Sequence, residues 1–61
     1  MFAQKIRELR QSRGLSEAAL DEIFDLMRGT VANWEHGFAV PDGELVEDIA
    51  AYFGIKVSEL Q

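Results

Sequence analysis

The stretch LDEIFDLMRGTVANWEHG, residues 20–37, decides the fold of this 61-residue chain. In its second half, Val31 and Trp34 are spaced i, i+3, which predicts a short helix over residues 28–36 with one buried face. The letters DLM before it predict a turn, because Asp25 belongs to the few non-glycine residue types that tolerate left-handed backbone. Two short helices joined by a tight turn are therefore expected in this stretch.

The helical period continues outward in both directions. The expected helices cover residues 2–13, 16–24, 28–36 and 43–53, with one last turn near the end of the chain. Ser16 and Asp42 are suitable N-caps, and glycines follow the expected helix ends at 14, 37 and 54. No stretch shows the alternation of a strand. We therefore predict an all-α, compact five-helix fold, with residues 1–61 forming a single domain.

Composition excludes several classes of protein. The chain has no cysteine, so it has neither a disulfide nor a thiolate zinc site. No apolar run approaches the roughly 18 residues that span a bilayer, and the first ten residues lack the apolar core of a signal peptide. A cytoplasmic protein without a membrane partner is expected, stabilised by one apolar core.

The net charge of −5 argues against a nucleic-acid partner, because phosphate contacts supply most non-specific affinity. The charge is unevenly distributed. Basic side chains gather in the first 15 residues, at Lys5, Arg7, Arg10 and Arg13. The helix expected before the turn carries acids instead. Any DNA-binding interpretation must explain these acids.

Two short helices joined by a tight turn form a helix-turn-helix motif. The stretches KIRELRQSRGLS, RGTVANWEHG and PDGELVEDIAAYFGIKVSEL resemble the Cro/CI-type (XRE) family of phage and bacterial repressors over essentially the whole chain. The resemblance implies a lambda-repressor-like fold and a repressor-like, sequence-specific transcriptional regulator. It also implies a homodimer that binds double-stranded operator DNA and reads the major groove with helix 28–36.

Matched by position, the DNA-binding residues implied by the resemblance are Arg28, Gly29, Thr30, Asn33 and Glu17. Arg28 could contact guanine O6 and N7, Asn33 could read adenine or a phosphate, and Thr30 suits a phosphate oxygen. The resemblance also implies a structural ion pair between Arg10 and Glu35. The alternative for Arg10 is a phosphate contact. We favour the ion pair, since Glu35 would otherwise sit uncompensated near the core.

Four positions depart from the family pattern. Glu17 replaces a glutamine, Asp21 a small alanine at a close helix contact, Asp25 a turn glycine, and Met27 the serine or threonine that caps the recognition helix. Losing that cap costs about 1 kcal/mol. A buried carboxylate at position 21 needs a partner or must tilt into solvent.

These departures motivate an alternative function. The chain would be a protein-binding module on a helix-turn-helix scaffold, naturally repurposed or engineered, that uses the Glu17–Arg28 surface and binds DNA weakly or not at all. An exposed apolar patch would provide the interface, formed by Ile23, Leu26, Met27 and Phe38, with Val40.

Other residues carry less specific signals. Trp34 is expected in the core, and His36 at the surface near a helix end. The acids from 42 to 48 lack the spacing of a calcium loop, and no serine has a histidine and acid arranged around it. We therefore expect no enzyme activity, no metal and no cofactor.

Overall fold

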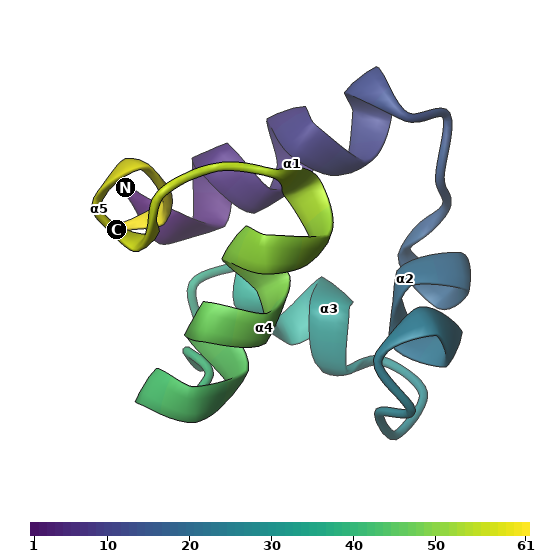
Figure 1. Cartoon of the computed structure of the whole chain (residues 1–61). Helices are drawn as coiled ribbons and strands as arrows, with labels where there is room; N and C mark the ends of the chain where they lie inside the picture. The colour runs from purple at the N-terminus through teal and green to yellow at the C-terminus, as the bar shows by residue number, and fades with distance from the viewer.

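Five α-helices joined by short connections form the whole chain in the computed structural model, which describes residues 1–61 (Figure 1). They are α1 (Phe2–Ser12), α2 (Glu17–Ile23), α3 (Thr30–Glu35), α4 (Gly43–Phe53) and α5 (Val57–Leu60). The prediction of an all-α, five-helix fold is confirmed. None of the helices combines the length and apolar character needed to cross a membrane.

The capping residues that the sequence indicates set the helix boundaries. The Ser16 hydroxyl accepts the Ala19 amide at 3.0 Å and starts α2. The Asp42 carboxylate accepts the Leu45 amide at 2.9 Å and starts α4. Gly14 adopts the left-handed conformation after α1, with φ of 66°. Such a residue ends a helix because the chain can turn away while its last carbonyls remain bonded.

All five helices contribute side chains to one apolar core. Its buried members are Ile6, Leu20, Val31, Trp34, Val46, Ile49, Ala50, Phe53 and Leu60. Phe2 packs edge-to-face on Trp34 with ring centroids 5.8 Å apart. This geometry favours the contact, since the positive ring edge meets the negative face. Trp34 is therefore a core residue, as predicted.

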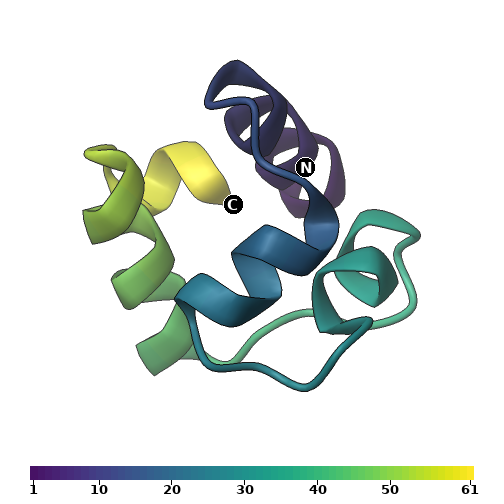
Figure 2. The same ribbon diagram turned by 90° about the vertical axis from the view of Figure 1, so that its right-hand side faces the viewer.

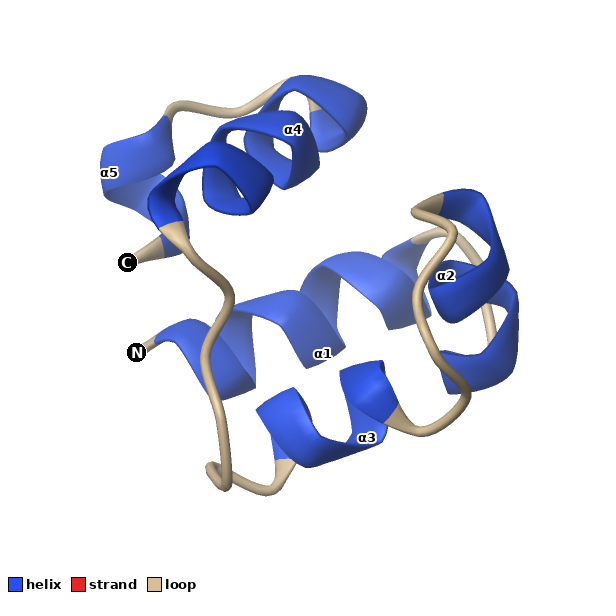
Figure 3. Ribbon diagram, turned by 90° about the horizontal axis from the view of Figure 1, so that it is seen from below, coloured by secondary structure: helices blue, strands red, loops and turns tan.

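The packing leaves α3 between two neighbours. α1 and α2 both pack against α3, and α4 packs against α5. Figure 2 shows α2 and α3 side by side, joined by a loop along the lower edge of the molecule. Figure 3 shows α3 running alongside α1, with α4 and α5 on the opposite side of α1. One face of α3 is thus buried, and the other is open.

Core packing predicts a large stability loss for Ile49→Ala. Ile49 is fully buried. Removing its side chain should reduce the free energy of unfolding by about 2–5 kcal/mol, through lost burial and a residual cavity. Urea unfolding followed by circular dichroism measures this loss. The matched control is Val40→Ala, at a residue that is 74% exposed. A similar loss in both variants would contradict the assignment of the core.

Candidate nucleic-acid interface

The turn between α2 and α3 begins as the sequence predicts. Asp25 has a positive φ of 54°, the left-handed conformation expected for it. The Leu26 amide then donates to the Asp21 carbonyl at 2.8 Å and closes the end of α2. Leu26 packs partly buried against the core, whereas Met27 is 84% exposed. The two apolar residues of the turn therefore have different environments.

The predicted helix over 28–36 is too long at both ends. α3 covers Thr30–Glu35, so Arg28 and Gly29 belong to the turn before it. Gly29 has a φ of 91°, which lies outside right-handed helix geometry. The helix therefore begins only after it. Arg28 is presented by the turn, while Thr30 and Asn33 are presented by the helix itself.

The start of α3 is capped by Asp21, a residue of α2. Asp21 Oδ2 accepts the Gly29 amide at 3.0 Å, and Oδ1 accepts the Val31 amide at 2.9 Å. Asp21 is only 4% exposed. Met27, at the position where the resemblance places the cap, offers only a weakly accepting thioether. The sequence pattern indicated that Asp21 needed a partner but did not identify the α3 amides as that partner.

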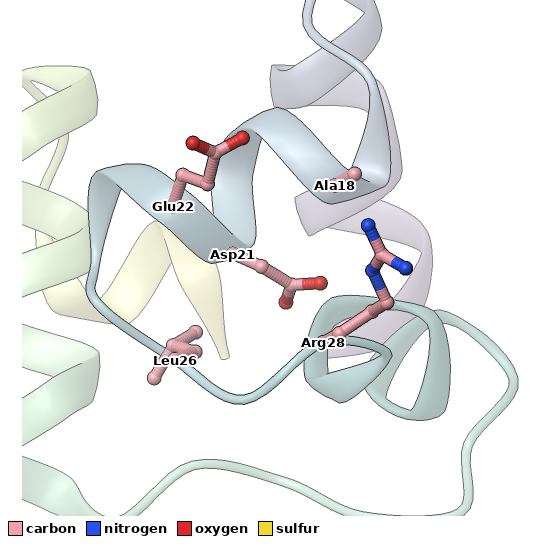
Figure 4. Close-up of a pocket in the computed structure, with 5 residues that line it drawn as sticks. All are labelled: Ala18, Asp21, Glu22, Leu26 and Arg28. Carbon is pink, nitrogen blue, oxygen red and sulfur yellow. The ribbon is translucent and has the colours of Figure 1, made fainter.

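Three of the predicted site residues line one hollow between α2 and α3. They are Glu17, Arg28 and Gly29, together with Ala18, Asp21 and Ala32. A second hollow adds Glu22 and Leu26 to Ala18, Asp21 and Arg28. In Figure 4 the Arg28 guanidinium reaches from the turn before α3 toward α2, on the side where the Asp21 carboxylate lies. The predicted contacts Thr30 and Asn33 do not line either hollow.

Arg28 is available for an external acceptor. The ion pairs of the chain are both made by Glu35, with Arg7 and Arg10, so the Arg28 guanidinium forms none. Asn33 is also exposed. Thr30 differs from both, because its hydroxyl donates to the Met27 carbonyl at 2.7 Å. A hydroxyl has a single donor, so this bond leaves Thr30 no hydrogen for a phosphate oxygen.

The predicted ion pair between Arg10 and Glu35 joins α1 to α3. Arg10 Nε lies 2.7 Å from Glu35 Oε2, and Arg10 Nη2 lies 2.8 Å from Oε1. Arg7 adds a contact that the sequence did not predict, with its Nε 3.2 Å from Glu35 Oε1. The Glu35 side chain has no exposed surface. Its carboxylate is thus compensated by two guanidinium groups.

This cluster shifts two pKa values in opposite directions. Burial by itself would raise the pKa of Glu35, but the hydrogen bonds from Arg10 and Arg7 outweigh burial and hold that pKa below its usual value. The hydrogen bond to Glu35 raises the pKa of Arg10, against the effect of burial. The nearby charge of Glu17 also raises the pKa of Arg10. Glu17 therefore belongs electrostatically to this cluster.

The three arginines in and directly after α1 form bonds within the protein. Arg7 and Arg10 bind Glu35. Arg13 donates to the Phe53 carbonyl at 3.2 Å and lies over the Phe53 ring at 5.2 Å. A cation at this end of α4 also complements the helix dipole. The acidic balance of the chain is therefore not offset by a free basic face on α1.

The predicted apolar patch divides into two parts. Met27 lies in the connection before α3, and Phe38 and Val40 lie in the connection after it. Figure 3 shows these connections at opposite ends of α3. Phe38 is 79% exposed and stacks on His36, with ring centroids 5.7 Å apart. The four predicted interface residues thus come from the end of α2 and from the connections on either side of α3, and Leu26 is partly buried against the core.

Comparison with known proteins identifies relatives of the whole motif. A helix-turn-helix family model matches residues 6–60. The transcriptional repressor RstR of the cryptic phage CTXphi of Vibrio cholerae is 33% identical over 60 residues, covering 98% of this chain and 54% of that protein. The HTH-type transcriptional activator BcrR of Enterococcus faecalis is 29% identical over 59 residues, covering 97% of this chain and 29% of that protein.

The matched region is only part of each relative. The chain spans about half the length of the repressor and less than a third of the activator. No solved structure matches the chain significantly.

The Glu35 cluster predicts that stability falls on acidification. Because the pKa of Glu35 is lower in the folded state than in the unfolded chain, its contribution is complete above the unfolded value, about 4.3. It is lost as the pH falls through the folded value. NMR titration of the Glu35 side-chain carboxyl carbon should give a midpoint below the ordinary glutamate pKa of about 4.3. A midpoint at or above the ordinary glutamate value would contradict this assignment.

Proposed function

We propose that this chain, which belongs to the Cro/CI-type (XRE) helix-turn-helix family, is the DNA-binding domain of a transcriptional regulator. It reads the major groove with the residues at the start of α3. One observation carries the proposal: the turn before α3 presents an unpaired Arg28 guanidinium, and α3 itself presents an exposed Asn33. Both matched relatives are named as transcriptional regulators.

Arg28 and Asn33 provide the base contacts in this proposal. The Arg28 guanidinium offers paired N–H donors to guanine O6 and N7, and the Asn33 amide offers a donor and an acceptor to adenine. Thr30 contributes through its methyl group, which can pack against a thymine methyl, because its hydroxyl hydrogen is bound to Met27. In this proposal Thr30 makes an apolar contact to a base and not the phosphate contact that the sequence predicts.

Phosphate attraction plays a smaller part than in most DNA-binding domains. The free basic groups are few, since Arg7, Arg10 and Arg13 are bound within the protein. Each phosphate contact contributes about 0.9 to the slope of log affinity against log salt. A domain with so few free cations needs base contacts, and two copies, to bind tightly.

Binding as a homodimer follows from this requirement. Dimeric helix-turn-helix proteins read two half-sites about one helical turn apart, which places their recognition helices in successive major grooves. A pseudo-palindromic operator would then receive one Arg28 from each copy. Doubling the base contacts compensates for the weak phosphate attraction of each copy.

DNA binding by this surface predicts a specific loss in Arg28→Ala. We expect duplex selection from a random pool in about 50 mM salt to enrich one site, since low salt favours phosphate contacts. Arg28→Ala should weaken binding to that site by about 1–3 kcal/mol and relax specificity at one base pair. Fluorescence anisotropy with labelled duplexes measures both effects.

The control is Lys56→Ala, which removes the same charge from the connection between α4 and α5. This variant should keep the affinity and the specificity of the unsubstituted chain. The absence of binding to any duplex in low salt would refute the proposed function. Equal losses in Arg28→Ala and Lys56→Ala would refute the role of Arg28.

Protein binding through the same edge is a second candidate function. It is favoured by the 84% exposure of Met27 beside Arg28, an apolar side chain where a DNA-facing turn needs none. In that function Met27 and Ile23 contact a protein partner, and Glu17 and Asp25 repel DNA. Methionine suits such contacts because its side chain is flexible and polarizable.

Reversion of the exposed departures separates the two functions. We would combine Glu17→Gln, Asp25→Gly and Met27→Ser and leave the buried Asp21 in place. If this edge evolved for a protein, the triple variant should gain about tenfold or more in DNA affinity, or 1.4 kcal/mol. If the chain is already a DNA reader, anisotropy should show a change of less than about threefold.

A further inference from the structure

α3 lacks a cap of its own. It has only six residues, and its N-cap position is Gly29, which has no side chain. Met27 carries a thioether that is a weak acceptor and is exposed. The first amides of a helix have no partner within the helix, and burying them unpaired is unfavourable. An acceptor from elsewhere in the fold is therefore required.

Asp21 meets this requirement with both carboxylate oxygens. One oxygen accepts the Gly29 amide at 3.0 Å and the other accepts the Val31 amide at 2.9 Å. The residue is 4% exposed, so water does not compete effectively for these bonds. A negative group at the start of a helix also interacts favourably with the helix dipole. No buried side-chain nitrogen or oxygen is left unpaired.

We propose that Asp21 is the positioning residue of the DNA-reading surface, because it caps α3 from α2 and thereby fixes the orientation of one helix relative to the other. This inference rests on the proposed function. A cap within the same helix orders only that helix end. A cap delivered from α2 links two helices, so a shift of α3 relative to α2 distorts the geometry of these hydrogen bonds.

The orientation of the proposed base-reading residues depends on the hydrogen bonds of Asp21 between α2 and α3. Arg28 immediately precedes the capped Gly29, and Asn33 follows within the same short helix. Base contacts are directional and require the side chains to approach the groove edge correctly. Loss of the Asp21 link should therefore reduce DNA affinity even in molecules that remain folded.

The chemistry of the site explains why an aspartate is suited to it. Two amide donors face the side chain, so two acceptor oxygens are needed. An asparagine would offer one oxygen, and its NH₂ group would oppose the second amide. An alanine would leave both amides without a partner. Asp21 and Met27 thus act as a linked pair, in which one residue performs the capping that the other cannot.

A comparison of Asp21→Ala with Asp42→Ala tests the proposal. Both variants remove an aspartate cap, but Asp42 caps its own helix, α4, through the Leu45 amide. We would measure hydrogen exchange at each amide, and DNA affinity per folded molecule on the selected duplex. In Asp21→Ala, the Gly29 and Val31 amides should lose protection and affinity should fall by about tenfold, as for one misplaced base contact.

Asp42→Ala should lose stability but keep both the protection of those amides and the DNA affinity of its folded molecules. Asp21→Asn should keep protection at one amide only, and it replaces Asp21→Ala if that variant does not fold. Adding Met27→Ser to Asp21→Ala, which restores a local acceptor, should recover part of the affinity.

Two results would overturn this inference and leave the proposed function intact. Unchanged protection of Gly29 and Val31 in the Asp21 variants would overturn the inference. So would a loss of affinity in Asp42→Ala as large as that in Asp21→Ala. If the unsubstituted chain binds no DNA, the proposed function fails, and the positioning role fails with it. The exchange data then still decide whether Asp21 caps α3.

Discussion

A helix of six residues, such as α3, is too short to be stable by itself, because helix nucleation is unfavourable and only longer helices recover its cost. The fold holds α3 at both ends with the only two buried charged residues of the chain, Asp21 and Glu35. Asp21 ties its first turn to α2 through two amides. Glu35 ties its last turn to Arg7 and Arg10 of α1. Between these two attached ends, Val31 and Trp34 pack into the core.

This arrangement resolves the conflict between an acidic chain and a DNA-reading motif. Asp21 faces inward, where backbone amides and the start of α3 compensate its charge. The three arginines near the start of the chain serve the fold, since Arg7 and Arg10 neutralise Glu35 and Arg13 binds the end of α4. The net charge of the sequence therefore describes neither the buried nor the exposed side of the motif well. For the proposed base contact, the relevant feature is that Arg28 forms no ion pair within the protein.

Much of the fold follows from local sequence, because caps, glycines and helical period act over a few neighbouring residues. Ser16, Asp42 and Gly14 therefore mark their helix ends correctly. The sequence predicts the start of α3 two residues too early, because the cap comes from Asp21, eight positions before Gly29 and on another helix. Such a bond depends on how closely two helices approach.

The candidate site also combines features that local sequence predicts with features that depend on how the helices pack. Arg7 lies three residues before Arg10 on α1, so the spacing places both on the side that faces Glu35, whereas the bond from Arg7 to Glu35 depends on how α1 and α3 pack. Met27 and Phe38 are both exposed, as predicted, but they lie in connections at opposite ends of α3 (Figure 3), an arrangement that depends on the path of the chain and not on local sequence. If few free cations face the duplex, binding to random sequence is weak, because that binding is almost entirely electrostatic. Discrimination between sites then depends on the direction of a few base contacts, which makes the rigidity of α3 more important than the charge of its surroundings.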